Sequence, residues 1–429
     1  MNLLAIETSC DETAMAIMNF SPLSARKGLE DRTKEINFSV LSNHVLSQIN
    51  LHREFGGVFP TLAKREHAKN IVRIFKECLK EANLYKEKEN INIDWEKDNE
   101  KIFSEMKEKF DYKKIEEIRD LLEREPEMYS ELIKLFLSIE KPDIEALAVT
   151  SGPGLAPALW VGINFAKAIS IIWDIEVYPI NHMEGHIVSA LISPTNEKEY
   201  LIKNISSPSL ALLISGGHTE IIYFEKIGKY KKIGKTLDDA VGEAFDKVAR
   251  SLDLPYPGGP EISKLAESSR KNDLKIISEF KLPRPMINSS ELDFSFSGLK
   301  TAVIYKIKEL EKLIEEKNIT RDDIKNLISL DFENAVTEIL LKKIRKAIEK
   351  YNTSNLLIGG GVIANSHIRK SFTELSIKEN INLYIPERFL TGDNAFMIGC
   401  AAITKIVRNE KSVHLSEIKA NSNWNVESL

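Results

Sequence analysis

The sequence predicts a two-lobed α/β protein that is built from a duplicated plan. Residues 3–17 run from an apolar strand through a polar turn to a second apolar strand. Residues 209–224 repeat this order around a turn of small residues, and each segment is typical of a β-hairpin. Because the same plan opens both halves of the chain, we expect two similar lobes with a cleft between them. Two unrelated hairpins are the alternative that the pattern leaves open.

The bulk composition favours a soluble, cytoplasmic protein. A chain of 429 residues suffices for two or three domains, and 43% apolar and 29% charged residues are typical of globular proteins. Three widely spaced cysteines without a CxxC pair favour a reducing compartment. The longest apolar run, residues 163–173, is broken by Asn164 and Lys167, and no signal peptide precedes the first strand, so we expect no membrane association. At a net charge of -5, any RNA contact requires a local basic patch or a partner.

The first half continues with a long helix and then a highly charged segment. Residues 61–82 carry apolar side chains at helical spacing. The stripe that we expect to be buried consists of Ile71, Phe75, Cys78 and Ala82. In residues 86–141 about half of the side chains are charged, yet apolar residues keep helical spacing on either side of Pro126. We predict a helical-hairpin insertion on the surface of the first lobe, with a solvated appendage as the favoured interpretation and a partner-docking arm as the alternative.

The second half repeats the alternation of strands and helices. Residues 144–149 first complete the N-terminal half as a buried strand. Thr320 and Asp323 form a capping box that opens a long amphipathic helix, and residues 356–358 read as a strand that ends in three glycines. We therefore divide the chain into an N-terminal and a C-terminal lobe, residues 1–205 and residues 206–429.

The segment Asn181–His186 carries the clearest signal of chemistry. His182 and His186 lie four residues apart and hence on one face of a helix, where a divalent metal ion such as zinc or iron could bind between them. A metalloprotease needs its base Glu directly after the first histidine, but Met183 holds that place. Glu184 points to the far side of the helix, about 200° around at 3.6 residues per turn. A protease is therefore disfavoured, and because a histidine pair alone is as often structural, a third ligand must come from elsewhere.

Two glycine turns at strand ends favour a nucleotide site. Ser215–Thr219 and Gly359–Val362 follow apolar strands, and glycine lets backbone N–H groups approach a phosphate closely. The second turn also leads into a helix, whose N-terminus favours an anion. Neither turn matches the Walker loop or the dinucleotide motif, and a tight turn is the commoner reason for paired glycines.

The acidic residues supply candidates for a third ligand and for proton transfer. They are Asp11, Glu12, Asp238, Asp239, Glu243, Asp246 and Asp393. Asp238 and Asp239 have the position of helix caps, whereas Asp246 could reach a ribose hydroxyl. Asp393 precedes an apolar run, where an acid is usually a cap, but it is also the best candidate for the third ligand. Oxygen and imidazole ligands together suit iron, zinc or manganese.

A series of ordered motifs resembles those of one family, the tRNA N6-adenosine threonylcarbamoyltransferases, called TsaD in bacteria. Members were once described as O-sialoglycoprotein endopeptidases because of their histidine motif. The resemblance covers nearly the whole chain except residues 86–141. The segments that carry it are Ile6–Thr13, Ser151–Gly154, His182–His186, Ser215–Thr219, Asp238–Lys247, Tyr256–Pro260, Phe294–Lys300, Gly359–Asn365 and Thr391–Asn394.

The resemblance implies a duplicated, two-lobed actin/Hsp70/sugar-kinase (ASKHA) fold and a transfer reaction. The threonylcarbamoyl group would move from threonylcarbamoyl-AMP to N6 of the adenosine 3′ of the anticodon in tRNAs. It further implies one divalent metal ion, iron in the first place and zinc as the alternative, and two partners, a TsaB-like paralogue and a TsaE-like ATPase. Matched motif by motif, the metal ligands are His182, His186 and Asp393. The residues that line the adenylate site are Leu213, Ile214, Ser215, Gly216, Gly217, Asp246, Gly259 and Asn365.

The sequence departs from the family's motifs in three places, but the histidines and the aspartate that are expected as metal ligands are all kept. Asn181 stands where the family has a further histidine, and Thr391–Asn394 differs at its first two positions but keeps the acid. No general base is clearly marked, and Asp11 and Glu12 are the candidates by their position in the first motif. The insertion at 86–141 could alter how a partner docks.

Two other functions compete with the transferase. An ATP-dependent small-molecule kinase or ATPase of the same superfamily would use Asp11 or Asp246 to handle magnesium. The histidine pair argues against it, because magnesium prefers oxygen ligands. A non-catalytic scaffold is the other alternative, and the intact set of His182, His186 and Asp393 argues against that.

Overall fold

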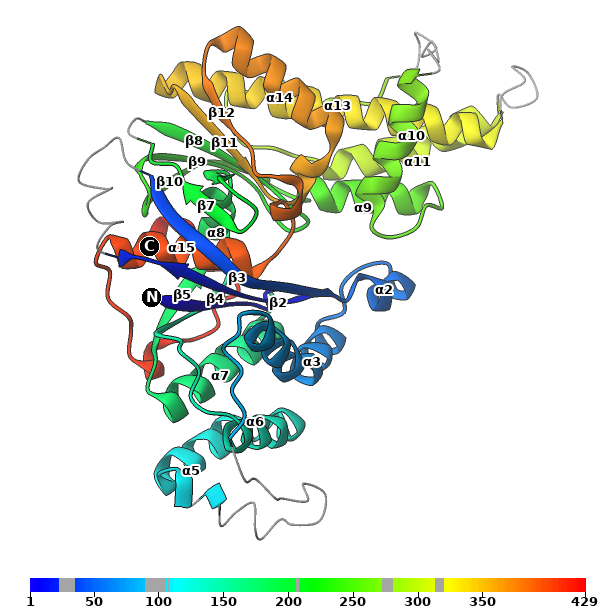
Figure 1. The fold of residues 1–429 in the computed structure, drawn as a ribbon. Helices are drawn as coiled ribbons and strands as arrows, with labels where there is room; N and C mark the ends of the chain where they lie inside the picture. The colour runs from blue at the N-terminus through cyan, green and yellow to red at the C-terminus, as the bar shows by residue number, and fades with distance from the viewer. Residues whose placement is uncertain (23–34, 89–104, 107, 206–207, 272–280, 313–319) are drawn as a thin grey trace.

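The chain folds into two β-sheets with helices between and outside them. The computed structural model describes residues 1–22, 35–88, 105–106, 108–205, 208–271, 281–312 and 320–429. The first sheet has seven strands in the order β5-β4-β1-β2-β3-β7-β6, and the second has five in the order β10-β9-β8-β11-β12. Figure 1 shows the two sheets as separate layers. The α/β class expected from the sequence is confirmed.

Central strands in both sheets are wholly buried. The first sheet contains β1 (Asn2–Glu7), β2 (Glu12–Phe20), β3 (Ile36–Ser47), β4 (Ala146–Gly152), β5 (Glu176–Asn181), β6 (Ile192–Pro194) and β7 (Glu199–Ile202). The second contains β8 (Ser209–Ile214), β9 (Thr219–Lys226), β10 (Lys229–Lys235), β11 (Asn355–Gly359) and β12 (Asn382–Tyr384). Every residue of β1, β4, β8 and β11 is buried, as expected of strands that are covered on both faces.

The strand pairing confirms the duplicated plan. β1 pairs antiparallel with β2, and β2 with β3, while β4 runs parallel to β1 and β5 parallel to β4. In the second sheet β8, β9, β10, β11 and β12 make the same pairs in the same order. The hairpins at 3–17 and 209–224 therefore hold equivalent places at the centres of their sheets, as the two-lobed fold requires.

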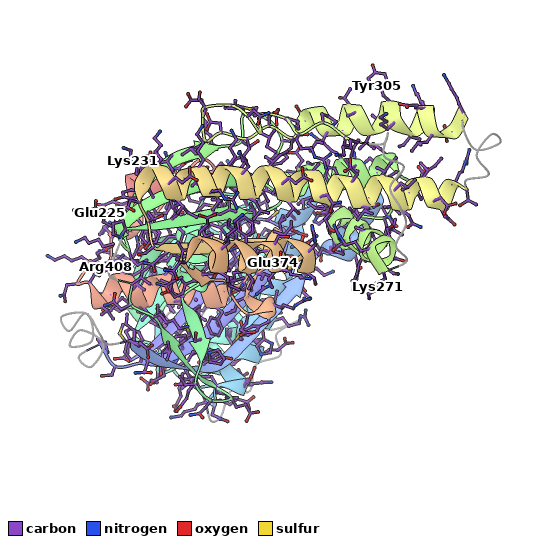
Figure 2. The ribbon with its side chains drawn as sticks, turned by 90° about the horizontal axis from the view of Figure 1, so that it is seen from above. Glu225, Lys231, Lys271, Tyr305, Glu374 and Arg408 are labelled. Atoms are coloured by element: carbon purple, nitrogen blue, oxygen red, sulfur yellow. The ribbon has the colours of Figure 1, made fainter. Side chains whose placement is uncertain are left out.

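Helices cover the outer face of each sheet (Figure 1). The first sheet is covered by α3 (Pro60–Glu81), α5 (Tyr112–Leu121), α6 (Pro126–Ser138) and α7 (Ala156–Trp173). Around the second sheet lie α9 (Val241–Ser251), α10 (Gly258–Lys271), α11 (Ser297–Lys312), α13 (Arg321–Tyr351) and α14 (Ser366–Glu379). Seen from above, α13 crosses the second lobe beside α14, which carries Glu374 (Figure 2). The predicted capping box of Thr320 and Asp323 opens α13.

Two helices, α8 (His182–Ser189) and α15 (Ala395–Val407), lie between the sheets. Their apolar side chains belong to one hydrophobic cluster that also contains residues of β1, β2, β8 and β9. The cluster includes Ala5, Met18, Met183, Ile187, Leu213, Ile222, Met397 and Ile398. At Gly399 of α15 an added Cβ would lie 2.5 Å from the Met18 sulfur, so α15 packs directly on the first sheet although we assigned it to residues 206–429. The last part of the chain thus returns to the first lobe.

The predicted helical hairpin forms, but it is continuous with the core of the first lobe. Ile115, Ile118, Leu132 and Phe136 are buried in the same hydrophobic cluster as α3 and α7. The outer faces of α5 and α6 carry the charged residues, which explains the high charge of the segment. The hairpin is therefore a covering layer and differs from the solvated appendage that we favoured. Residues 89–104 and 107 of the expected insertion lie outside the described part.

One helix in the described part of the chain, α7, is long and apolar enough to cross a membrane by length and composition. Of its residues, 72% are buried inside the fold. It packs between α3 and β4, which is the position of a core helix. The apolar run at 163–173 is therefore explained by burial of every residue except Asn164 and Lys167, which are only partly buried.

The glycine turn after β11 generates a prediction about stability. Gly360 has a φ of +97°, and its added Cβ would lie 2.4 Å from the carbonyl oxygen of Ile214. We expect Gly360→Ala to lower the free energy of unfolding by roughly 2 kcal/mol, measured by urea denaturation. Gly361→Ala is the matched control, because no described atom lies within 4 Å of its Cβ position. Equal unfolding midpoints for the two variants would contradict the prediction.

Candidate metal centre and substrate cleft

The position of the two histidines is set at the junction of β5 and α8. Asn181 ends β5 and its side-chain oxygen accepts hydrogen bonds from the backbone N–H of Met183 at 2.9 Å and of Glu184 at 3.2 Å. Asparagine is a favoured N-cap because it satisfies donors that the first turn leaves free. The departure from the family at Asn181 therefore starts the helix and fixes the direction in which His182 and His186 point.

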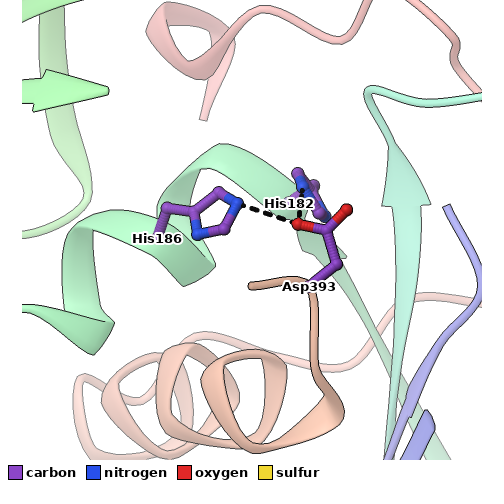
Figure 3. A group of neighbouring side chains, drawn as sticks. All are labelled: His182, His186 and Asp393. Atoms are coloured by element: carbon purple, nitrogen blue, oxygen red, sulfur yellow. Dashed lines mark ion pairs between the residues drawn. The ribbon is translucent and has the colours of Figure 1, made fainter. Parts of the chain in front are cut away.

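Asp393 meets both histidines from the turn before α15. Its Oδ1 lies 3.4 Å from Nε2 of His182 and 3.2 Å from Nε2 of His186 (Figure 3). One ligand atom of each residue lies within 4.8 Å of the others. The helix cap that we considered for Asp393 is supplied by Asn394, whose Oδ1 accepts from the N–H of Met397 at 2.8 Å. The structure thus brings together the three residues that were matched as ligands.

Glu7 supports His182 from behind, and sequence analysis gave it no role. Its Oε2 lies 3.1 Å from Nδ1 of His182 and accepts a hydrogen bond of 2.7 Å from the hydroxyl of Thr150. The Ser9 hydroxyl lies 3.2 Å from the same Nδ1. A carboxylate on Nδ1 fixes the tautomer of an imidazole and leaves Nε2 free to bind a metal. The signal that could have found Glu7 is a charged residue at the end of a wholly apolar strand.

The buried charges strongly perturb one another. Burial acts to raise the pKa of the Asp393 carboxyl, but the charge of His182 and the contacts with both imidazoles hold it well below its usual range. Burial acts in the opposite sense on His182, yet Asp393 and Glu7 raise the pKa of this imidazole well above its ordinary value. Burial lowers the pKa of His186 despite its contact with Asp393. The pKa values of the two imidazoles are therefore shifted in opposite directions.

The residues of this cluster fit a divalent metal ion. Nδ1 of His186 is buried and lacks a hydrogen-bond partner within the described part of the chain, while its Nε2 contacts only Asp393, at 3.2 Å. Leaving a buried polar atom unpaired costs about 1–3 kcal/mol, so this imidazole is suited to accept a ligand. Two imidazoles and one carboxylate form a donor set for zinc, iron or manganese. Asp393 is the most exposed of the three at 24% of its side chain, which leaves one side of the cluster accessible.

Glu184 lies on the opposite face of α8, as the helical geometry predicted. Its Oε1 accepts from the Tyr230 hydroxyl at 3.2 Å, and it lies 3.6 Å from Arg408 and 3.9 Å from Lys405. Burial raises the pKa of Glu184, although Lys405 and Arg408 act against it. These contacts join α8 to β10 and α15, so Glu184 holds the histidine helix in place and lies on the side of α8 away from His182 and His186.

The turn Ser215–Gly217 offers open space, whereas the strand before it does not. No described atom lies within 4 Å of the Cβ position of Gly216 or Gly217. Leu213 and Ile214 are 0% exposed, so neither residue presents a surface to a ligand in this structure. His218 follows the turn, and burial, then the charges of His182 and His186, lower its pKa to about 4. His218 is thus a neutral imidazole near the cluster, which sequence analysis did not assign.

The other expected substrate residues make structural contacts of their own. Asp246 accepts a hydrogen bond of 2.7 Å from the N–H of Gly258 at the start of α10. Asn365 caps α14 by accepting from the N–H of Ile368 at 2.9 Å, and its amide donates to Glu333. No described atom lies within 4 Å of the Cβ position of Gly259, so that glycine faces open space.

Asp11 and Glu12 differ in their surroundings. Asp11 is 7% exposed, and its Oδ2 is buried without a hydrogen-bond partner among the described residues. Glu12 accepts a hydrogen bond of 3.2 Å from Ser47. Burial raises the pKa of both carboxyls. Burial, and after it the charges of Asp11 and Asp246, also raise the pKa of Tyr256, which sequence analysis did not assign.

The contacts of Glu184 generate a second prediction. Glu184→Ala leaves Arg408 and Lys405 without their buried counter-charge, so we expect a loss of about 3 kcal/mol in the free energy of unfolding. Urea denaturation measures the change. Glu410→Ala is the matched control, because Glu410 pairs with the same two cations but is 44% exposed, and its loss should cost under about 1 kcal/mol. A stability of Glu184→Ala equal to that of Glu410→Ala would refute the role given to Glu184.

Comparison with known proteins identifies the family. The family model for TsaD, described as tRNA N6-adenosine threonylcarbamoyltransferase, matches residues 39–91 and 118–400. Within residues 86–141, only 92–117 fall outside the match, so the unmatched part is shorter than the insertion we expected. An activator of 2-hydroxyisocaproyl-CoA dehydratase from Clostridium difficile, solved with bound ADPNP, is 10% identical, with a TM-score of 0.42 over 96% of this chain and 100% of that one.

Curated relatives match over nearly their full length. A tRNA N6-adenosine threonylcarbamoyltransferase from Thermosipho africanus is 37% identical over 94% of this chain and 93% of its own. Enzymes of the same description from Dictyoglomus turgidum and Halalkalibacterium halodurans are each 36% identical, over 96% and 94% of this chain and 96% and 90% of their own. The chain therefore belongs to the TsaD family, the tRNA N6-adenosine threonylcarbamoyltransferases.

Proposed function

We propose that this protein transfers the threonylcarbamoyl group from threonylcarbamoyl-AMP to N6 of the adenosine 3′ of the anticodon in tRNAs. The products are N6-threonylcarbamoyladenosine and AMP. The observation that carries the proposal is the convergence of His182, His186 and Asp393, where Nδ1 of His186 is buried without a partner among the described residues. The glycine turn at Gly216 and Gly217 faces open space. The family to which the chain belongs supports the same reaction.

The three converging residues would hold one divalent metal ion. Nε2 of His182, one nitrogen of His186 and a carboxylate oxygen of Asp393 are the proposed ligands. Glu7 would keep the His182 ring in the tautomer that binds a metal. The family resemblance favours iron, and zinc remains the alternative. When bound, the ion supplies positive charge that stabilises the negative charge growing on the leaving phosphate.

The adenylate substrate would lie along the glycine turn of the second lobe. The open space at Gly216 and Gly217 suits a phosphate, because its oxygens can accept hydrogen bonds from backbone N–H groups there. Ser215, Asp246, Gly259 and Asn365 are proposed to line the same site, and Leu213 and Ile214 are proposed to position its turn from the buried strand behind it. Fixing the two substrates in one orientation supplies a large part of the acceleration.

The bond changes require a proton acceptor near the tRNA adenosine. The N6 lone pair attacks the carbamoyl carbon, the bond from that carbon to the phosphate oxygen breaks, and AMP leaves. The proton lost from N6 needs a base, and Asp11 is favoured over Glu12 because its Oδ2 is unpaired among the described residues. Asp11 could take this proton directly or through water.

The reaction implies tRNA and protein partners in the cytoplasm. A TsaB-like paralogue and a TsaE-like ATPase are the partners that the family resemblance suggests. The net charge of -5 is compatible with a paralogue that contributes part of the RNA-binding surface. A magnesium-dependent kinase or ATPase is not favoured, because the cluster offers two imidazoles.

Mass spectrometry of nucleosides tests the proposal. Unmodified tRNA is incubated with this protein, threonylcarbamoyl-AMP and the paralogue and ATPase from the same cell. We expect threonylcarbamoyladenosine with the native chain and at least about 100-fold less with His186→Ala, because the variant lacks a ligand that positions the ion. Elemental analysis should show that the variant also loses its metal.

His414→Ala is the matched control for that experiment. His414 is an exposed histidine whose ring contacts Ser416, so both metal content and activity should be unchanged. Circular dichroism checks that the His186 variant is folded. Full activity of a metal-free His186→Ala protein would contradict the role given to the ion, and no product from the native chain would contradict the reaction itself.

Asp11→Asn separates the two acidic candidates. The amide keeps the shape of the side chain but cannot take a proton, so we expect kcat to fall by about 10²–10⁴ with little change in the KM of either substrate. Glu12→Gln should have a much smaller effect, because Glu12 binds Ser47. Steady-state rates of threonylcarbamoyladenosine formation at varied concentrations of each substrate give both constants, and an Asp11→Asn protein with normal kcat would exclude Asp11 as the base.

A further inference from the structure

Two exposed phenylalanines lie on the segment that joins β3 to α3. Phe55 is 58% exposed and Phe59 is 52% exposed. Their ring centroids are 5.7 Å apart with an angle of 22° between the planes, so the rings stack on each other. Burying a phenylalanine side chain is worth about 1.5–3 kcal/mol, and two aromatic rings that remain in solvent therefore need a reason outside the core.

The segment with this aromatic pair lies at the border between the lobes. Nε of Arg53 donates to the carbonyl oxygen of Tyr256 at 3.1 Å, and the Arg250 guanidinium donates to the carbonyl oxygen of Gly56. Figure 1 accordingly shows α2 (Ile49–His52), which is part of the segment, below α9. The aromatic pair thus lies where the two lobes meet, a region that we call the rim.

The same segment is tied to the first-lobe acid. The backbone N–H of Gln48, at the start of α2, donates to the carbonyl oxygen of Asp11 at 2.9 Å. Tyr256, which Arg53 contacts, lies close enough to Asp11 and Asp246 for their charges to raise its pKa. The rim that carries Phe55 and Phe59 is therefore adjacent to the acids that we place beside the reacting groups.

The chemistry of the rim matches single-stranded nucleic acid. Arg53 and Arg250 are both exposed, and each contacts or belongs to the segment with the stacked rings. Exposed aromatic faces that stack bases, next to guanidinium groups that contact phosphates, are the recurrent equipment of proteins that bind unpaired RNA. An apolar protein partner that covered this region would remove water from the two guanidinium groups without offering them a partner of its own, and this costs free energy.

We propose that Phe55 and Phe59 form a stacking platform for an unpaired base of the anticodon loop, next to the adenosine that is modified. Arg53 and Arg250 contact the adjoining phosphates. The inference rests on the proposed transfer to tRNA. An adenosine whose N6 enters the cleft must leave its own stack, and its neighbour then loses a stacking partner. The platform replaces that partner and holds the loop open.

Kinetics with the complete system tests the platform. For Phe55→Ala and Phe59→Ala, we expect the KM for unmodified tRNA to rise by about 5- to 100-fold, the factor given by the loss of one base–aromatic stack. The KM for threonylcarbamoyl-AMP should stay the same. Phe55→Tyr should restore most of the tRNA affinity, because it keeps the aromatic face.

Tyr305→Ala is the matched control, and it should leave the KM for tRNA unchanged. Tyr305 is 68% exposed on α11 and points away from the body of the molecule (Figure 2).

A double-mutant cycle identifies the base. Anticodon stem-loops that each lack one base are titrated against native, Phe55→Ala and Phe59→Ala proteins, with the partners present. For one stem-loop, the one that lacks the stacking base, we expect the variants to bind as tightly as the native protein does, because the contact they have lost is already absent. Effects that are fully additive at every position would overturn the proposal, as would an unchanged KM for tRNA with weaker binding of the paralogue. If the native protein makes no threonylcarbamoyladenosine, yet deleting one loop base and one phenylalanine has a non-additive effect on tRNA binding, the proposed reaction is wrong and the platform is confirmed.

Discussion

The buried contacts of His182 with Glu7 and Asp393 are the constraint on which the rest of the structure depends. Glu7 is 0% exposed and His182 is 5% exposed, and an unpaired charge in such surroundings would cost several kcal/mol. The three side chains come from β1, from α8 and from the turn before α15, so each is paired only when all three segments are in place. The two-lobed fold and the candidate metal centre therefore cannot be separated: the packing of α8 and α15 between the sheets is also the assembly of the site.

The glycine turn after β11 shows how closely the second lobe approaches this centre. An added Cβ at Gly359 would lie 2.5 Å from the carbonyl oxygen of His186, and one at Gly360 would meet Ile214. These two glycines allow the backbone of β11 to pass α8 and β8, so their small size is required by packing. Our interpretation of the turn as a phosphate site therefore applies only to Gly361, whereas Gly216 and Gly217 in the β8–β9 turn of the same sheet both face open space. Two glycine turns of one sheet thus have different tasks.

The sequence predicts those features that depend on local patterns. The two hairpins, the helix at α3, the capped start of α13 and the placement of Glu184 away from the histidine face all follow from periodicity or helical geometry. Contacts between distant segments do not. The approach of Glu7 to His182, the return of α15 to the first sheet and the position of Tyr256 near Asp11 each join residues more than a hundred positions apart, and nothing in a local window distinguishes such partners. The convergence of His182, His186 and Asp393 was expected through the family resemblance, because spacing alone offered several acids for the third place.

The two lobes are joined in two physically different ways, and this difference bears on how a tRNA gains access. Between the sheets, α8 and α15 bury an extended apolar cluster, and Glu184 pairs with groups of β10 and α15 in the interior. At the rim, the lobes meet through the hydrogen bonds of Arg53 and Arg250, which are exposed and contribute about 1 kcal/mol each. Separating the lobes at the rim therefore breaks only weak contacts, while separating them at the centre would expose buried charges. Because Asp246 accepts a hydrogen bond from the N–H of Gly258, two residues after Tyr256, a movement of the rim would also reach the proposed adenylate site. The weak contacts thus lie between the proposed RNA platform and the proposed adenylate site, whereas buried charges fix the centre around His182.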